Sequence, residues 1–448
     1  MTDPATPSPP SFRYAAFVVG VLIVAYTFSY IDRTILTLMV KPIRATLQIS
    51  DVQISLLHGL AFALFYTFLG IPIGRLIDRR KRTTIVAVGI AVWSIMTALC
   101  GLSNSFAWMF AARIGVGIGE AALSPAAYSM LADYFSGKRL VRALSFYQSA
   151  VYLGPALATV AGGVMLSRLS PAETVIGHLE PWQQVFVIVG LPGLLIALVV
   201  SRLREPERRG SGVKEPPPSF GAVLGHMRNH LRAYGLLILG VSLQSVMWNG
   251  STAWYPTHFM RAYDWTPAQV AAGYGPALAV FGTSGGLFGG WLAGRMRDWG
   301  WTDSNVRIGI FAALGALPFG FLAPLMPTGN LSLAMVCGFL FFGATPYGGI
   351  AASFQEITPN RMRGQVSAIY LFGLNIAGIG FGGTIVALVT AHVYGGDEMI
   401  GRGISTVAGI AAALSAVVLI TCLPGYRRAM GIEAPEAHAE AARAADSR

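Results

Sequence analysis

The chain has 448 residues, of which 54% are hydrophobic and 12% are charged, whereas roughly 25% of the residues are charged in a typical soluble domain. Apolar runs long enough to cross a bilayer, about 20 residues each, recur along the whole length and exclude a separate soluble domain of any size. The formal net charge of +11 does not indicate a nucleic-acid-binding protein, because Lys and Arg lie in short groups between apolar runs and form no continuous stripe.

Hydropathy, punctuated by Gly, Pro and charge clusters, predicts an all-α membrane protein with twelve transmembrane helices. The predicted helices cover 14–40, 51–75, 83–103, 105–133, 140–167, 182–203, 232–258, 266–295, 306–326, 330–354, 363–390 and 403–423. The one long polar connection contains Glu215 followed by three prolines, and it divides the chain into halves of six helices. We expect an N-terminal tail (1–13), a first bundle (14–203), a cytoplasmic linker (204–231), a second bundle (232–424) and a C-terminal tail (425–448).

The distribution of cations predicts the orientation of the helices. If the N-terminus is cytoplasmic, most Lys and Arg residues lie in inside segments, and the outside segments hold only Lys41, Arg44, Arg168, Arg261 and Arg402. An excess of cations marks cytoplasmic loops. We therefore predict an integral protein of the plasma (cell inner) membrane with both termini in the cytoplasm.

The first predicted helix carries an acid near the end of its apolar stretch, in residues 30–33 (Tyr-Ile-Asp-Arg). If Asp32 is buried beside Arg113, it is ionised, and loss of that partner would favour its protonated form because burial disfavours charge. That is the physical basis of a proton switch. The alternative is that Asp32 and Arg33 form a solvated pair at the outer interface.

Residues 74–82 (Gly-Arg-Leu-Ile-Asp-Arg-Arg-Lys-Arg) follow the second predicted helix. They resemble the loop signature of the major facilitators, except that Lys81 stands where the family usually has Gly. The resemblance implies a cytoplasmic gate in which Asp78 pairs with a nearby Arg and with a helix N-terminus; its members here are Gly74, Asp78, Arg79, Arg82 and Arg142. The alternative is an ordinary positively charged inside loop. Residues 290–295 look like a second copy that lacks the acid, which would concentrate the gating charge in the first half.

The two halves of the chain resemble each other. Residues 133–142 after the fourth helix and residues 356–363 after the tenth are both charged, and each is followed by a helix that contains Ser and Tyr. Such a repeat is typical of transporters built from duplicated units. With the loop signature, it indicates the major facilitator fold: two pseudo-symmetric six-helix bundles.

The fourth predicted helix contains residues 113–120 (Arg-Ile-Gly-Val-Gly-Ile-Gly-Glu). Arg113 and Glu120 are seven residues apart, hence on nearly the same face and about 10.5 Å apart along the axis. Charges at this depth are costly and should face partners inside the bundle. The glycines of a dinucleotide-binding loop would follow a strand; within an apolar helix we expect them to serve helix packing.

Residues 29–33, 113–121 and 131–135 together resemble the Spinster-like branch of the major facilitators, whose members include lysolipid and sphingolipid transporters. The resemblance implies that Asp32, Arg113 and Glu120 form a proton-coupling set. Organic-anion/proton symporters carry similar residues in the first and fourth helices, so this branch stays an alternative.

Polar and aromatic residues at helical spacing provide candidates for the wall of a substrate cavity. They are Tyr30, Gln148, Tyr152, Gln244, Trp248, Asn249, Tyr347, Tyr370 and Asn375.

We predict a proton-coupled secondary transporter that works by alternating access, for an amphiphilic anion such as a lysolipid or a sphingosine phosphate. A proton symporter for a small organic anion is the second hypothesis. The three cysteines, Cys100, Cys337 and Cys422, lie far apart in apolar segments and fit neither a metal site nor a disulfide framework. The sequence has no His-Glu-x-x-His protease motif, and isolated paired charges fit a switch better than a channel. We therefore expect no metal, no other cofactor, no enzyme activity and no nucleic-acid partner; the lipid bilayer, the substrate and protons are the expected partners of a monomer.

Overall fold

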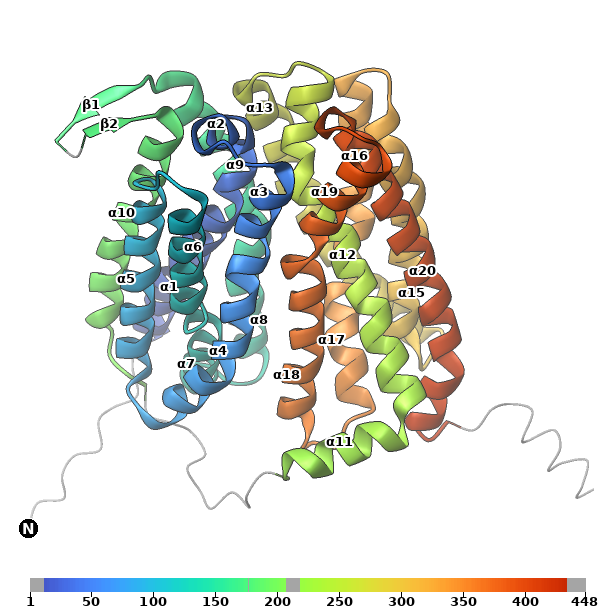
Figure 1. Ribbon diagram of the computed structural model, residues 1–448. Coiled ribbons are helices and arrows are strands. Elements are labelled where there is room, and N and C mark those ends of the chain that lie inside the picture. The colour runs from blue at the N-terminus through green and yellow to red at the C-terminus, as the bar shows by residue number, and fades with distance from the viewer. Residues whose placement is uncertain (1–11, 176, 207–217, 433–448) are drawn as a thin grey trace, which may run out of the picture. The chain divides into compact units, whose positions relative to one another are not determined.

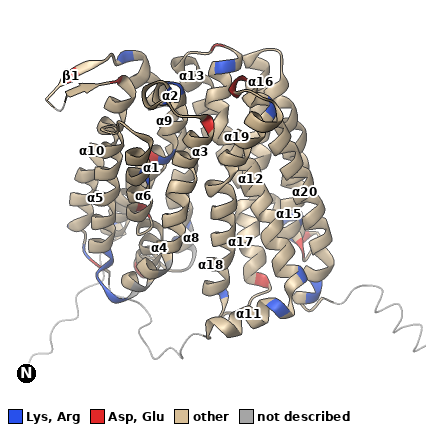
Figure 2. Ribbon diagram, in the orientation of Figure 1, with Lys and Arg blue, Asp and Glu red and all other residues tan. Residues whose placement is uncertain are grey.

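The computed structural model describes residues 12–175, 177–206 and 218–432, and it is almost entirely helical. Within these residues, twelve segments are long and apolar enough to cross a membrane. They confirm the prediction of twelve transmembrane helices. Helices suit a bilayer because every backbone polar group is satisfied within the segment. Figure 2 shows that acidic and basic residues lie mostly near helix ends, where charges can reach water.

The contacts divide the chain into two units, 1–49 with 64–213, and 50–63 with 214–448. Within its described residues, the first unit contains one short helix, eight longer helices and a small hairpin; Figure 1 shows their arrangement within the unit. Its elements are α1 (Phe12–Ile35), α2 (Val40–Leu47), most of α4 (Leu60–Arg79), α5 (Arg82–Cys100), α6 (Phe106–Glu120), α7 (Leu123–Tyr134), α8 (Gly137–Gln148), α9 (Ala150–Arg168), β1 (Ala172–Thr174), β2 (Gly177–Leu179) and α10 (Pro181–Ser201).

The second unit has the same helical character. Its helices are α3 (Asp51–His58), α11 (Phe220–Asn229), α12 (Leu231–Ala262), α13 (Pro267–Ala277), α14 (Thr283–Asp298), α15 (Ser304–Leu322), α16 (Gly329–Ala344), α17 (Tyr347–Glu356), α18 (Arg363–Leu374), α19 (Gly382–Val393) and α20 (Ile400–Ala429). Two π-helical turns, Leu278–Gly282 and Asn375–Gly380, join α13 to α14 and α18 to α19.

The structure differs from the predicted organisation in three places. Residues 50–63, expected in the first bundle, pack with the second unit, where α3 contacts α19. The predicted linker contains α11, and an antiparallel hairpin, β1 paired with β2, connects α9 to α10. The hairpin was missed because each strand has only three residues, too few for an alternating pattern to stand out.

The glycines of the fourth span pack helices, as predicted. A Cβ atom at Gly119 would lie 2.6 Å from the carbonyl oxygen of Gly89, and one at Gly89 would lie 2.6 Å from the carbonyl oxygen of Gly119. α5 and α6 therefore approach each other through two small residues. This close crossing holds the polar face of α6 in the interior of the first unit.

Candidate functional site

Asp32 near the end of α1 is 2% exposed and faces two other helices of the first unit. Its Oδ1 lies 3.4 Å from Nη1 of the fully buried Arg113 on α6, and its Oδ2 accepts a hydrogen bond from the hydroxyl of Thr97 on α5. A buried carboxylate needs such partners to stay ionised. The structure therefore brings together Asp32 and Arg113.

Glu120 at the end of α6 is held by a second pair of groups from α1. Its Oε2 accepts a 2.5 Å hydrogen bond from the hydroxyl of Ser29, and it lies 2.6 Å from Nε and 2.5 Å from Nη2 of Arg33. Ser29 and Arg33 are four residues apart, so they lie on one face of α1. Both guanidinium nitrogens thus approach the same carboxylate oxygen, and charge-assisted hydrogen bonds of this kind are among the strong polar interactions of proteins.

Asp32 and Arg33, although adjacent, thus have different partners. Both the burial of Asp32 and the position of Arg33 contradict the alternative of a solvated pair at the outer interface. The predicted set of Asp32, Arg113 and Glu120 also lacked Arg33, which the structure places in direct contact with Glu120. The four-residue spacing to Ser29 was the signal in the sequence that could have identified it.

The four ionisable side chains balance in charge. Two carboxylates face two guanidiniums, and no side chain of the four is more than 13% exposed. The other oxygen of the Glu120 carboxylate, Oε1, is buried and has no hydrogen-bond partner among the described residues. One added proton would leave this buried group with a net positive charge, which is costly without a counter-ion.

Tyrosine rings surround the guanidinium of Arg33. The rings of Tyr30 and Tyr66 each lie 4.9 Å from it, a cation–π distance. Tyr26 packs against Tyr30 with ring centroids 5.1 Å apart, and it stacks on Tyr147 at 4.5 Å. Tyr26, Tyr66 and Tyr147 were not among the predicted cavity residues. The polar pair of Arg33 and Glu120 therefore adjoins an aromatic surface.

Of the other predicted cavity residues of the first unit, Gln148 lies next to this aromatic surface, because it contacts Tyr128, whose ring lies 5.7 Å from that of Tyr147. Gln148 is exposed and accepts a 3.1 Å hydrogen bond from the Tyr128 hydroxyl. Tyr152 is half-buried on α9. Two residues further along, a Cβ atom at Gly154 would lie 2.4 Å from Cβ of Tyr30, so this glycine lets α9 cross α1 closely.

The predicted cavity residues of the second unit divide into two groups. Trp248, Asn249, Tyr347 and Asn375 are half-buried, and the rings of Trp248 and Tyr347 lie 6.3 Å apart. Gln244 and Tyr370 instead lie within the packing of the unit. Gln244 donates a 2.6 Å hydrogen bond to the carbonyl oxygen of Gly309, and Tyr370 stacks on Phe354 at 4.3 Å. Helical spacing alone does not distinguish a cavity face from a packed face, and in this structure these two side chains lie on a packed face.

Arg82, predicted as part of a cytoplasmic gate, is 1% exposed at the start of α5. Its Nη1 lies 2.5 Å from Oδ2 of Asp133, and its Nε lies 2.6 Å from Oε1 of Glu205. Glu205 also accepts a 3.1 Å hydrogen bond from the backbone amide of Thr83. A carboxylate is favourable at a helix N-terminus, the role that the resemblance implied for Asp78.

The remaining predicted gate residues do not join the contacts of Arg82. Arg79 and Arg142 are exposed and Gly74 is half-buried, while the side chain of Asp78 lies outside the described part of the structure. Asp133 and Glu205 were not among the predicted gate residues.

A family model described as the Major Facilitator Superfamily matches residues 22–383, which is most of the chain and both halves of the fold. The chain belongs to the major facilitator superfamily. It is therefore an integral membrane transporter with twelve spans and not an enzyme.

Relatives place this major facilitator in the Spinster-like branch. Protein spinster homolog 1 of Xenopus tropicalis is 27% identical over 357 residues, which cover 75% of this chain and 64% of the relative, so the chain spans less than two thirds of that relative's length. A crystal structure described as a bacterial homolog of the human lysosomal transporter Spinster is 25% identical with a TM-score of 0.78 and covers 95% of this chain and 100% of its own.

Other relatives carry different descriptions. An MFS-type efflux pump of Mycolicibacterium smegmatis is 28% identical over 379 residues, 83% of each chain. A probable L-galactonate transporter of Escherichia coli is 26% identical over 294 residues, which cover 62% of this chain and 60% of the relative. Because these descriptions differ in what is transported, the comparisons do not identify the substrate.

The second unit of this major facilitator also has a charged cluster, contrary to the expectation that such charge is concentrated in the first half. Glu356 accepts a hydrogen bond from Arg297, a 2.8 Å hydrogen bond from Asn305 and a 2.6 Å hydrogen bond from the Tyr426 hydroxyl. The 290–295 segment lacks an acid, but Glu356 is the last residue of the tenth span, much as Asp133 is the second-last residue of the fourth.

Asp303, just before α15, is the second acid of this cluster. It accepts a 2.6 Å hydrogen bond from Arg307 and a 2.8 Å hydrogen bond from Arg427. Burial alone would raise the pKa of the Asp303 carboxyl, but the hydrogen bonds and positive charges of Arg307 and Arg427 outweigh burial and lower that pKa below its ordinary value.

Proposed function

We propose that this transporter couples the movement of an anionic amphiphile to the movement of protons by alternating access. The observation that carries the proposal is the neutral set of four buried charges, in which Asp32 contacts Arg113 and Glu120 contacts Arg33. Ionisable residues inside a membrane are costly and mark ion or substrate pathways. In this proposal Asp32, Arg113, Glu120 and Arg33 form the proton-coupling site.

In this proposal, the charge balance of the four buried side chains couples proton binding to anion binding. A proton on Glu120 would weaken its ion pair with Arg33 and leave the set with one excess positive charge. An anionic group of the substrate at Arg33 would restore neutrality. Because a proton or an anion alone leaves a buried net charge, the two bind together more favourably than either does separately. Proton and anion would then cross in the same direction.

The aromatic surface beside Arg33 supports an amphiphilic substrate. A headgroup at the guanidinium would lie next to the rings of Tyr30, Tyr66 and Tyr26, which can contact an apolar chain. A lysolipid or a sphingoid phosphate has this chemistry, and it is the class that the resemblance to the Spinster-like branch implied. A small organic anion is the second candidate, which the galactonate relative supports.

Flux into proteoliposomes, with and without a pH gradient, tests the coupling. We expect Asp32→Asn, Arg113→Ala and Glu120→Gln each to reduce proton-driven flux by about 10²-fold or more, as is found when a positioned acid–base group is lost. Glu173→Gln on the exposed hairpin, far from the site in sequence, is the matched control and should transport normally. Retained proton-driven flux in all three site variants would overturn the proposal.

The class of substrate is tested by thermal stability of the purified protein, since a ligand that binds the native state raises the melting temperature. Lysolipids and sphingoid phosphates should stabilise the wild type, and Arg33→Gln should lose that effect. Stabilisation by small carboxylates alone would favour the second candidate.

We also propose that both termini are cytoplasmic in the cell inner membrane, that the monomer is the working unit, and that Arg82 with Asp133 and Glu205 belongs to the cytoplasmic gate. Removal of any one partner of Arg82 should slow transport without changing which substrates stabilise the protein.

A further inference from the structure

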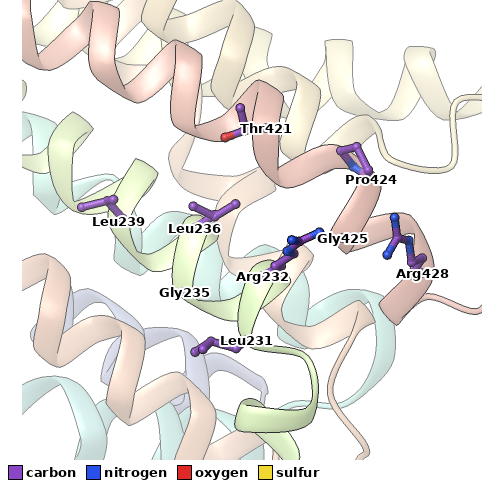
Figure 3. Close-up of a pocket in the computed structure, with 9 residues that line it drawn as sticks. All are labelled: Leu231, Arg232, Gly235, Leu236, Leu239, Thr421, Pro424, Gly425 and Arg428. Carbon is purple, nitrogen blue, oxygen red and sulfur yellow. The ribbon is translucent and has the colours of Figure 1, made fainter.

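A groove of about 740 Å³ lies between the start of α12 and the end of α20, in the second unit (Figure 3). Its lining includes Leu231, Arg232, Gly235, Leu239, Gly425 and Arg428. They lie within the first three turns of the seventh span or the last two turns of the twelfth. The groove is thus at the boundary between the hydrocarbon and the polar surface.

The two arginines of the groove, Arg232 and Arg428, are exposed. Among the described residues, neither guanidinium forms an ion pair or a hydrogen bond. The neighbouring Arg427, in contrast, pairs with Asp303 at 2.7 Å. The structure therefore leaves two guanidiniums at one groove with no acid to neutralise them.

Two glycines shape the groove: Gly425 lets α20 approach α12 beside Arg232, and Gly235 leaves the groove open. A Cβ atom at Gly425 would lie 3.1 Å from Cβ of Arg232, so α20 and α12 approach closely there. At Gly235 the nearest atom to such a Cβ is Leu231 Cδ1 at 3.6 Å, so a side chain at this position would project into free space. Further from the arginines, Leu239 is 48% exposed and continues the groove along the span.

We propose that this groove binds an anionic phospholipid of the surrounding bilayer, in the leaflet that we place on the cytoplasmic side. Basic pockets between transmembrane helices are suited to anionic headgroups. The phosphate lies between Arg232 and Arg428, where two guanidiniums donate charge-assisted hydrogen bonds. An acyl chain lies along Leu231 and Leu239. A free anion would use the arginines but leave the apolar wall in contact with other lipids.

The site is separate from the proton-coupling site, whose residues all belong to the first unit. The lipid is accordingly a bound component of the transporter and not its cargo, and binding does not depend on the proposed function.

Native mass spectrometry of the purified full chain, titrated with phosphatidylglycerol or phosphatidylcholine, tests the proposal. We expect tighter retention of phosphatidylglycerol, by about fivefold per arginine contact, the equivalent of about 1 kcal/mol for each cation near an anionic lipid. The double variant Arg232→Gln with Arg428→Gln should lose this preference. Gly235→Leu should weaken lipid binding with both charges intact, because its side chain fills the groove.

Two control variants separate the groove from general effects. Arg402→Gln removes an exposed arginine from the other end of α20, and Gly290→Leu adds a side chain where no atom lies within 4 Å. Both should bind phosphatidylglycerol as the wild type does. Equal retention of the two lipids by the wild type would overturn the proposal, as would unchanged binding in the double variant and Gly235→Leu. Inorganic phosphate that displaces the lipid, or a lysolipid that binds more tightly than the two-chain lipid, would also contradict it.

Discussion

At the scale of single residues, the pair of Arg33 and Glu120 shows how a membrane protein can keep charges in its interior. The Glu120 side chain is fully buried and the Arg33 side chain is 13% exposed. Their hydrogen bonds offset the cost of removing both from water only while both partners are present. The same dependence makes the pair suited to a switch that a proton can operate.

Arg33→Met should lower the free energy of unfolding by about 3–5 kcal/mol, because Glu120 is left as an uncompensated buried charge. Adding Glu120→Met should recover most of that loss while transport stays abolished. Thermal unfolding of the two variants in one detergent measures the difference. Arg168→Met, at an exposed helix end, should stay within about 0.5 kcal/mol of the wild type. A single variant as stable as the double variant would contradict this account of the pair.

At the scale of elements, α14 packs against the end of α16 through small residues. Cβ atoms at Gly285 and Gly289 would lie 2.1 Å and 2.0 Å from the carbonyl oxygens of Phe341 and Thr345. Small residues four apart allow backbones to touch. Backbone oxygens cannot move aside as a side chain can, so the spacing of these helices depends on both glycines.

Gly289→Ala should therefore destabilise the protein by about 1–3 kcal/mol, the usual cost of overpacking. Gly290→Ala, one residue further along the same helix, meets no atom within 4 Å and should change stability by less than about 0.5 kcal/mol. Chemical or thermal unfolding of both variants side by side checks the contrast. Equal effects of the two substitutions would show that the close contact at Gly289 does not determine the loss of stability.

A second link between elements is Asp303, which joins the start of α15 to Arg427 at the end of α20. Its pKa in the folded protein is lowered because the pull of Arg307 and Arg427 outweighs burial. The ionised form therefore stabilises the fold above the unfolded-state pKa of about 3.9. This contribution is lost as the pH falls through the lower, folded-state value.

Asp303→Asn should lower the melting temperature at pH 7, and the difference from the wild type should shrink as the pH falls below about 4. Melting curves from pH 7 to pH 3 measure this. Asp298→Asn, at an exposed position near the end of α14, should show no such convergence. A constant difference between Asp303→Asn and the wild type at every pH would rule out the titration of this carboxyl as the cause.

At the scale of the whole molecule, the distribution of cations along the chain predicts the orientation in the membrane. The hairpin of β1 and β2 and the helix α11 lie in connections that the proposed topology places on opposite sides. His178 and Arg228 are exposed residues of these two elements. Their accessibility therefore tests the topology directly.

In a variant whose three cysteines are replaced by Ala, His178→Cys should react with a membrane-impermeant maleimide on intact cells. Arg228→Cys should react only after the cells are permeabilised. A gel shift measures the labelling of each variant before and after permeabilisation. Reaction of the cysteine at position 228 in intact cells would show that the orientation is the reverse of the proposed one.

The sequence by itself determined the twelve spans, the two halves and the presence of ionisable residues at membrane depth. Hydropathy and charge are properties of consecutive residues, so a window about one span long is enough to read them. The packing role of the glycines in α6 could be predicted for the same reason, because an apolar helix offers them little else.

Only the tertiary structure decided which charges meet. Arg33 contacts Glu120 across 87 positions of the chain, and Arg82 contacts Glu205 across 123. No local pattern specifies such pairs, since they depend on how helices cross and on which face each one turns inward. The same reason explains why Gln244 and Tyr370 lie in the packing of the second unit: periodicity identifies a face of a helix, and only its neighbours determine whether that face lines a cavity or fills a core.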